Sequence, residues 1–132
     1  MPRASGSTRL FRGKYFFLTY SAVGIPATIS DPAAPATVDN DRRAAAFVEE
    51  WNAGVVRWGC TKWVLGQEPH QDGAWHFHAV VYKEKGWDIT SARYFDVAGT
   101  HPNVSKPKSA EERKNKIRYC TKGYCLGESS PT

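Results

Sequence analysis

Hydrophobic and polar residues along the chain follow two different spacings, one typical of strands and the other typical of helices. Residues 14–20 (KYFFLTY) are dense in aromatic and β-prone residues, which indicates a buried strand. Residues 57–68 and 74–83 have a similar character and are separated by a short polar turn, so they predict an antiparallel hairpin. Residues 86–88 close this unit, and residues 91–97 predict a further short strand.

The first helical segment lies between a long loop and the hairpin. Residues 22–40 contain three prolines and many small or polar residues, which predicts a loop. Asp39 or Asp41 is a candidate N-cap for a helix that runs to about Asn52 and is ended by Gly54. The apolar face of this helix consists of either Ala45, Val48 and Trp51 or Ala44, Phe47 and Trp51.

A second helix is predicted over residues 108–121, after a proline-containing loop at residues 101–107. Ser109 or a neighbouring residue is the candidate N-cap, and two glutamates fall in the first turn, where acids favour the helix dipole. Gly123 and Gly127 follow the segment and end the helix.

Length and composition restrict the class of protein. The 132 residues suit one domain, and 41% hydrophobic residues with 13% aromatic ones are enough for a packed core, which excludes wholesale disorder. The mean hydropathy of -0.53 and the lack of a long apolar run exclude a membrane-spanning helix. Three cysteines without a zinc-type spacing are typical of a reduced, intracellular protein whose thiols are small core residues or bystanders.

The net charge of +5 is concentrated at the two ends of the sequence. Residues 1–14 hold four basic residues and no acid, and residues 106–122 hold seven basic and two acidic residues. The stretch between them has more acids than bases. Basic ends around an acidic middle favour contact with a polyanion such as nucleic acid, although basic helices and tails are often only solvated. Residues 1–13 are interpreted as a flexible basic arm rather than a transit peptide, because strong strand signal follows at once.

Two histidines in the second strand of the hairpin are candidate metal ligands. Side chains alternate between the faces of a strand, so Trp75, Phe77, Ala79 and Val81 share an apolar face that should pack on the helices. His76 and His78 share the other face, where two imidazoles can converge on one ion.

Glu68 is the third candidate ligand, because it ends the preceding strand just across the turn. Two imidazoles and a carboxylate suit Mn²⁺ or Mg²⁺ with open positions for water and substrate. His70 lies in the turn and is an alternative ligand. The lack of cysteine in this cluster argues against a structural zinc site. The competing interpretation is that the two histidines only decorate a solvent-facing strand.

The basic helix contains a tyrosine and a lysine with a chemical rationale. Tyr119 and Lys122 are three residues apart and lie on one helix face. A tyrosine can attack phosphorus and form a covalent intermediate. A phenol ordinarily titrates near pH 10, so a nearby ammonium or a metal-bound oxygen is needed at neutral pH. Tyrosine and lysine at this helical spacing are common. Taken alone, the pair is more often part of the core or of the solvent-exposed surface than part of an active site.

Together these segments are far more specific than any one of them. Residues 17–20 (FLTY), 76–78 (HFH) and 119–122 (YCTK) resemble, in order and spacing, the three rolling-circle motifs of HUH endonucleases, the replication initiators of small circular single-stranded DNA viruses. Residues 93–96 (RYFD), followed by residues 101–104 (HPNV), resemble an additional segment of the geminivirus and genomovirus replication proteins. The resemblance runs from about Phe11 to Gly123. The long loop at residues 22–40 departs from the family pattern.

The resemblance implies an α+β fold, with a central antiparallel sheet of about five strands and flanking helices, ferredoxin-like or RRM-like. It implies an HUH domain at residues 14–127, and a tail or linker at residues 128–132 that leads in full-length relatives to a helicase domain. By resemblance, Tyr119 is the nucleophile and Lys122 assists proton transfer or positions the phosphate, while Glu68, His76 and His78 bind Mn²⁺ or Mg²⁺.

The implied activity is the nicking and joining of single-stranded DNA at a stem-loop origin in the host nucleus, through a 5′-phosphotyrosine, with oligomers formed through the full-length protein. The candidate DNA-binding residues are basic or aromatic: Arg9, Arg12, Lys14, Tyr20, Arg93, Lys116 and Arg118. Tyr82 is a further candidate for stacking on bases, and Tyr20 has the alternative of a core position.

Three other functions remain open from the sequence. A non-catalytic RRM-like module also combines a small sheet, aromatic residues and basic ends, although no RNP-like run is present. A phosphodiesterase that uses water would leave no DNA on tyrosine. Relaxases and transposases of the same superfamily differ in the substrate hairpin and in the number of catalytic tyrosines; Tyr124 reads as a poor second nucleophile.

Overall fold

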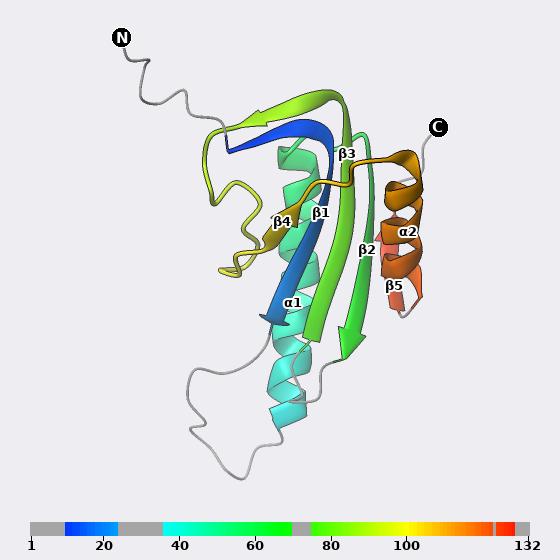
Figure 1. The fold of residues 1–132 in the computed structure, drawn as a ribbon. Helices are drawn as coiled ribbons and strands as arrows, with labels where there is room; N and C mark the ends of the chain where they lie inside the picture. Colours follow the sequence, from blue (N-terminus) through cyan, green and yellow to red (C-terminus); the bar gives the residue numbers. More distant parts are fainter. Residues whose placement is uncertain (1–9, 24–35, 70–74, 123, 129–132) are drawn as a thin grey trace.

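Five antiparallel strands form one sheet in the computed structural model, which describes residues 10–23, 36–69, 75–122 and 124–128. The strand order across the sheet is β4-β1-β3-β2-β5 (Figure 1). The α+β architecture with two flanking helices confirms the predicted fold class. In chain order the elements are β1 (Phe11–Val23), α1 (Ala36–Arg57), β2 (Lys62–Pro69), β3 (Trp75–Ile89), β4 (Asn103–Ser105), α2 (Ala110–Thr121) and β5 (Tyr124–Glu128).

The main hydrophobic core fills the space between α1 and one face of the sheet. Phe47 and Trp51 of α1 are fully buried against alternate residues of the two central strands. Phe77, Ala79 and Val81 all belong to this core, and Trp75 packs against it, which confirms the predicted apolar face of the third strand. Burial of the three side chains therefore fixes the register of β3, because a slip by one residue would expose them.

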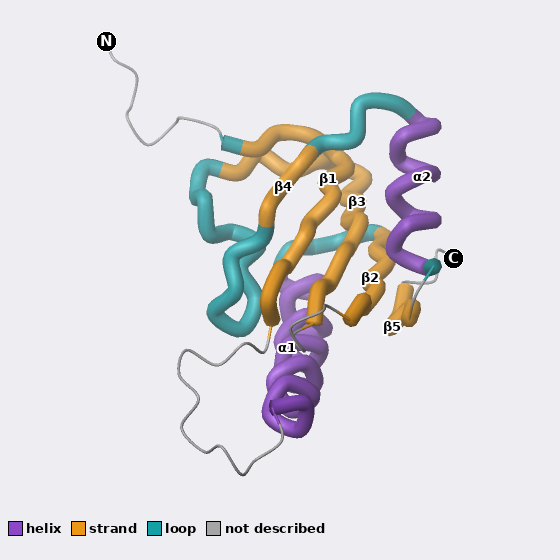
Figure 2. The backbone as a smooth tube through the Cα atoms, turned by 60° about the horizontal axis from the view of Figure 1, so that its bottom comes forward, coloured by secondary structure: helices purple, strands orange, loops and turns teal. Residues whose placement is uncertain are grey.

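The second helix packs on the opposite face of the sheet, over β2, β3 and β5 (Figure 2). Its contact is thin, because Cys120 is its one buried residue among those that the structure describes. Cys120 joins Phe17, Val64 and Val80 in a small second cluster. The alternation along β1 and β3 thus divides the sheet into a face with a deep apolar core and a face with sparse apolar contacts.

The first helix is longer than its sequence pattern predicts, and the predicted end at Gly54 is wrong. The helix continues to Arg57, so β2 begins at Lys62 and not at residue 57. Gly54 tolerates the helix interior because the ring of Trp58 packs against it: a Cβ there would lie 3.0 Å from Trp58 Cη2. This glycine marks a close packing contact and not a helix end.

The middle of the chain also differs from the predicted elements. The predicted strand that ends at residue 83 continues to Ile89, through Gly86 with φ 82°. Its far end pairs with the start of β1, where Phe11 lies opposite Ile89. Residues 91–97 form turns instead of the predicted strand, apart from a single bridge between Val97 and Thr100. The predicted loop at residues 101–107 contains the short strand β4.

The second helix has its predicted N-cap, whereas Lys122 is its C-cap and Gly127, predicted to help end it, lies in β5. The Ser109 side chain accepts a hydrogen bond from the Glu112 amide at 3.1 Å, and the helix ends at Thr121. The sequence pattern missed β5, which pairs with β2 directly after this helix. Residues 1–9, 24–35, 70–74, 123 and 129–132, which include parts of the predicted arm, loop, turn and tail, lie outside the described residues. Neither of the two described helices is long and apolar enough to cross a membrane.

Candidate functional site

Strand pairing brings the predicted ligands together on the face that carries α2. Glu68 lies directly opposite His76 in the β2–β3 ladder, and His78 lies opposite Gly66. On its other side His78 lies opposite Thr19 of β1. The predicted placement of Glu68 across the turn from the histidine pair is therefore confirmed by the register.

His78 occupies a buried position at the centre of this group. Its exposed fraction is 8%, and its Nε2 atom lies 3.2 Å from Glu68 Oε1. Burial lowers the pKa of His78 below its ordinary value, and this effect outweighs the opposing influence of the Glu68 carboxylate. The imidazole is thus neutral at neutral pH, which is the form that binds metal ions.

The ring of Tyr119 stands edge-on against His78. The centroids of the two rings are 4.8 Å apart and their planes are perpendicular, at 89°. Phe17 lies parallel to His78 at 5.9 Å and edge-on to Tyr119 at 6.4 Å. Tyr119 remains 40% exposed. The phenol is therefore held by two rings of the sheet while solvent and a substrate can still reach it.

The close approach of α2 to the sheet depends on Gly66. A Cβ atom at this position would collide with the carbonyl oxygen of Cys120, so only glycine allows the helix backbone to lie on β2 here. Cys120 is the neighbour of Tyr119 in the chain, and Gly66 is the neighbour of His78 in the ladder. This contact therefore sets the distance between the tyrosine and the histidine.

Two lysines of α2 and its C-cap approach rings of the site. Lys122 Nζ lies 4.8 Å from the centre of the Tyr119 ring, and Lys116 Nζ lies 4.6 Å from the centre of the Phe17 ring. Both distances are within the range of cation–π contacts. A small hollow opens beside these groups, and it is lined by Gly66, Gln67, Glu68, His78, Tyr119, Cys120 and Lys122.

The residues fit a divalent ion in chemistry, and in part in geometry. One carboxylate and two imidazoles are suitable ligands, and Glu68 already contacts His78. The ring centroids of the partly exposed His76 and of His78 are 6.4 Å apart, so the two rings have to move closer for both to reach one ion. Within the described ranges, no three His, Cys, Asp or Glu side chains yet have the spacing of a metal site.

The predicted DNA-binding residues have different positions. Tyr20 is a core residue with no exposed surface, and its hydroxyl donates to the Phe95 carbonyl at 2.5 Å, so the prediction that it stacks on DNA is wrong. The Tyr20 side chain lies on the face of the sheet that packs against α1, opposite the face that carries the site. Lys116 does belong to the site. Arg9 lies outside the described residues.

The other basic candidates lie farther from the hollow. Arg12 and Lys14 are exposed on β1. Arg118 is exposed on α2, where it bonds Asn115 Oδ1 at 3.4 Å. Arg93 lies in a turn with an exposed side chain, 3.8 Å from Asp96. The predicted contacts of these four residues with DNA are not tested by their positions and stay predictions.

The sequence motifs did not single out Gly66 or the role of Phe17 as a ring against His78. Glycine inside a strand pattern is a known signal for close approach of another backbone, and Gly66 lies inside the predicted strand at residues 57–68. Phe17 belongs to the first motif, but its contact with Tyr119 arises from the packing of α2, which no local pattern encodes.

Comparisons with known proteins identify relatives over most of this chain. Residues 42–127 match the family described as the geminivirus Rep catalytic domain. The chain is 33% identical over 117 residues to the replication-associated protein A of maize streak virus genotype A (isolate Kenya), which covers 86% of this chain and 36% of that protein. It is 42% identical over 64 residues to the replication-associated protein of genotype B (isolate Tas), which covers 48% of this chain and 17% of that protein. The chain spans well under half of the length of these relatives.

Proposed function

Since the chain belongs to the family of geminivirus Rep catalytic domains, we propose that it nicks and rejoins single-stranded DNA through a covalent bond to Tyr119. By this reaction it would start and end rolling-circle replication of a circular viral genome. The observation that carries the proposal is the edge-on contact of Tyr119 with His78, which in turn contacts Glu68. Three segments distant in sequence thereby supply a nucleophile and a ligand group beside one hollow.

Tyr119 is the nucleophile in this proposal. Its Oη atom forms a bond to the scissile phosphorus and loses its proton to solvent, while the bond from phosphorus to the 3′ oxygen breaks. The products are a 5′-phosphotyrosine and a free 3′-hydroxyl. One phosphodiester replaces another, so the step is reversible and the same site can rejoin the two ends without a nucleotide cofactor.

Lys122 has two roles in the same step. Its ammonium group lies 4.8 Å from the centre of the Tyr119 ring, so it places a positive charge beside the attacking phenol. The same group can donate a proton to the leaving 3′ oxygen and recover it in the reverse reaction. Lys122 caps α2 and lines the hollow, so it faces the position that a phosphate would take.

Glu68, His76 and His78 are the proposed ligands of Mn²⁺ or Mg²⁺. A divalent ion held there would draw negative charge from the non-bridging oxygens of the phosphate. The burial that keeps His78 neutral supports a ligand role, and Phe17 fixes the plane of its ring. Glu68, His76 and His78 would hold the ion, and the ion would supply the positive charge that attracts the scissile phosphate to Tyr119.

The proposed substrate is single-stranded DNA at a stem-loop origin. In-line attack requires a backbone that an intact duplex does not offer. By family resemblance, the site would act in the host nucleus, ahead of a helicase domain and in an oligomer formed through the full-length protein.

A covalent adduct tests the proposal directly. The protein is incubated with Mn²⁺ and an origin-like single-stranded oligonucleotide, and a shift in mass is mapped to Tyr119. Tyr119→Phe should form no adduct, whereas Tyr94→Phe, a partly buried tyrosine on the other side of the sheet, should retain it. DNA binding without cleavage would favour the non-catalytic module, and cleavage without an adduct would favour a phosphodiesterase that uses water.

A further inference from the structure

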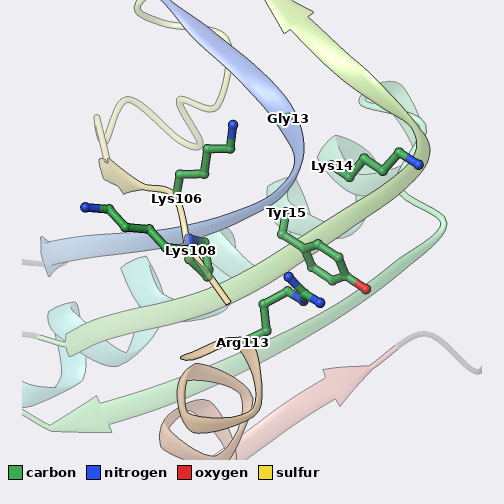
Figure 3. A pocket seen from close by; sticks show the side chains of 7 residues that line it. Gly13, Lys14, Tyr15, Lys106, Lys108 and Arg113 are labelled. Carbon is green, nitrogen blue, oxygen red and sulfur yellow. The ribbon is translucent and has the colours of Figure 1, made fainter. Parts of the chain in front are cut away.

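A wide basic groove lies on the same side of the sheet as Tyr119, near the other end of α2. Its volume is about 730 Å³, and Figure 3 shows the basic side chains around it. The lining residues come from the start of β1, from the connection between β4 and α2, and from the first turns of α2. They are Gly13, Lys14, Tyr15, Lys106, Pro107, Lys108 and Arg113.

The groove has a strongly positive lining. Four of its seven lining residues are cations and none is an acid. A capping box at the start of α2 uses two amides, because Ser109 accepts from the Glu112 amide and the Glu112 carboxylate accepts from the Lys108 amide at 3.0 Å. An anion in the groove would meet the four cationic side chains of the lining.

Part of the lining is fixed in place. Lys106 Nζ donates to the Arg12 carbonyl at 2.7 Å, and its side chain passes directly over Gly13. A Cβ at Gly13 would lie 2.8 Å from Lys106 Cε, and the φ of 155° at Gly13 also favours glycine. The lack of a side chain at Gly13 thus leaves room for Lys106, and the hydrogen bond to Arg12 holds the Lys106 ammonium group at the wall of the groove.

The aromatic floor of the groove is continuous with the floor of the Tyr119 site. Arg113 lies 4.4 Å above the Tyr15 ring, one helix turn before Lys116 lies above Phe17. Tyr15 and Phe17 are two residues apart in β1, so their side chains face the same side of the sheet. From residue 113 to residue 119, the helix rises by about 9 Å. A chain of cations over rings therefore connects the groove to Tyr119.

We propose that this groove binds backbone phosphates of the DNA strand beyond the scissile phosphate. This inference rests on the nuclease function proposed above and extends it with a second contact region. Lys14, Lys106 and Lys108 supply charge to the phosphates, and Lys116 links them to the hollow at Tyr119. The Tyr15 ring already contacts Arg113 and Tyr82, so it is not free to stack on a base. The groove would therefore recognise the charged phosphates and not the base sequence.

The test measures binding of oligothymidylates of about 4 to about 16 nucleotides by fluorescence anisotropy over a range of salt concentrations. Wild-type affinity should rise with length once a strand reaches from Tyr119 into the groove. The double variant Lys14→Gln with Lys108→Gln should lose this gain, and its salt slope for the long strand should fall by about 1.4, since each phosphate contact contributes about 0.7. Both lysines are exposed, so the substitutions leave the core intact.

The control removes the same charge from the opposite face of the sheet. Arg42→Gln with Arg57→Gln on α1 should keep the wild-type slope and length dependence. An equal loss in this control, or an unchanged slope in the lysine variant, would overturn the proposal. Saturable binding of inorganic phosphate alone at micromolar concentration, lost in the lysine variant, would show a site for a free anion and would also overturn it.

The binding assay and the adduct assay fail independently. A wild-type protein that forms no adduct, but whose salt slope falls in the lysine variant, would refute the nuclease and retain the groove. A protein that forms the adduct, with an unchanged slope in the lysine variant, would do the reverse.

Discussion

At the scale of single residues, the site combines a half-exposed phenol with a nearly buried imidazole. Tyr119 keeps its edge against His78, so its ring has little freedom to turn without losing that contact. Lys122 is the side chain that brings a positive charge to the ring from the solvent side. In the proposed reaction this arrangement would orient the hydroxyl in advance, which would lower the entropic cost of reaching the transition state.

Lys122 should therefore influence the rate of cleavage more than the affinity for DNA. We expect Lys122→Met to slow formation of the covalent adduct by about 100-fold or more, the usual range for loss of general acid–base assistance. Lys122→Arg keeps the positive charge but transfers protons poorly, and should retain only part of the rate. Single-turnover kinetics at saturating DNA measure the rate. An equal change in affinity with no change in rate would assign Lys122 to binding.

The ligand group makes a prediction that does not depend on activity. Titration calorimetry with Mn²⁺ should detect one binding site in the wild-type protein. His78→Ala and Glu68→Ala should each remove the signal, because both groups are needed to complete the ligand set. His101→Ala is the matched control, since His101 is bonded to Asp96 at 2.6 Å outside the site. Undiminished Mn²⁺ binding in His78→Ala would exclude this metal site.

The sequence predicted which residues form the site, but only in part which face of the sheet each side chain lies on. His76 and His78 are two apart in a strand, so period-two alternation placed them on one face correctly. The same rule puts Tyr20 on the face opposite Tyr15 and Phe17, and burial at 0% confirms a core position. The expected stacking role failed because the family motif carries no information on which of its residues faces the helix α1.

At the scale of elements, Gly66 couples α2 to the sheet. Gly66→Ala would force the Cys120 carbonyl, and with it Tyr119, away from His78. We expect a fall in adduct rate larger than the fall in DNA affinity, with a modest loss of stability. The proton chemical shifts of the Tyr119 ring should report the displacement, because edge-on ring contacts shift proton resonances.

A second glycine separates this effect from general destabilisation. Gly99→Ala has no atom within 4 Å of its new Cβ but retains a φ of 77°, so it costs about 1–2 kcal/mol in backbone strain without touching α2. Its adduct rate should stay near that of the wild-type protein. If both variants lose the same activity, the role of Gly66 is only structural.

Element boundaries were predictable where local signals decide them. Ser109 is a cap by its own hydrogen bond, and the start of α2 follows from sequence. The end of α1 depends on Trp58, which packs back on Gly54 from outside the helix. Strand β5 depends on its pairing with the β2 edge, and the five residues alone carry no strong strand pattern. Both features arise from tertiary contacts.

At the scale of the whole molecule, the two sheet faces divide the work. The α1 face contains the large aromatic core, and the α2 face contains the polar site on a small cluster. The first face can therefore provide stability while the second leaves Tyr119 and the groove accessible. The order of the motifs allowed the constellation to be predicted, but the alignment of Arg113 and Lys116 over Tyr15 and Phe17 required the packing of α2 on the sheet.

The stability of the whole fold should fall at alkaline pH. Burial raises the pKa of Cys60 from 9.0 to about 12 and also raises that of the Tyr20 hydroxyl. The folded chain therefore keeps protons that the unfolded chain releases above about pH 9. With fewer protons bound in the unfolded state, the free energy of unfolding decreases as pH rises from about 9 toward 12.

Urea unfolding at about pH 8 and about pH 11 measures this linkage. The wild-type midpoint should drop between the two values by more than that of the double variant Tyr20→Phe with Cys60→Ala. The variant should be less stable at the lower pH, because it lacks the hydrogen bond from Tyr20 to the Phe95 carbonyl, worth about 1 kcal/mol. The two proteins differ only at residues 20 and 60, so the difference between their drops in midpoint isolates the two buried groups. An equal drop in midpoint for both proteins would contradict the prediction. It would mean that neither buried group keeps its proton in the folded state at a pH where it ionises in the unfolded chain.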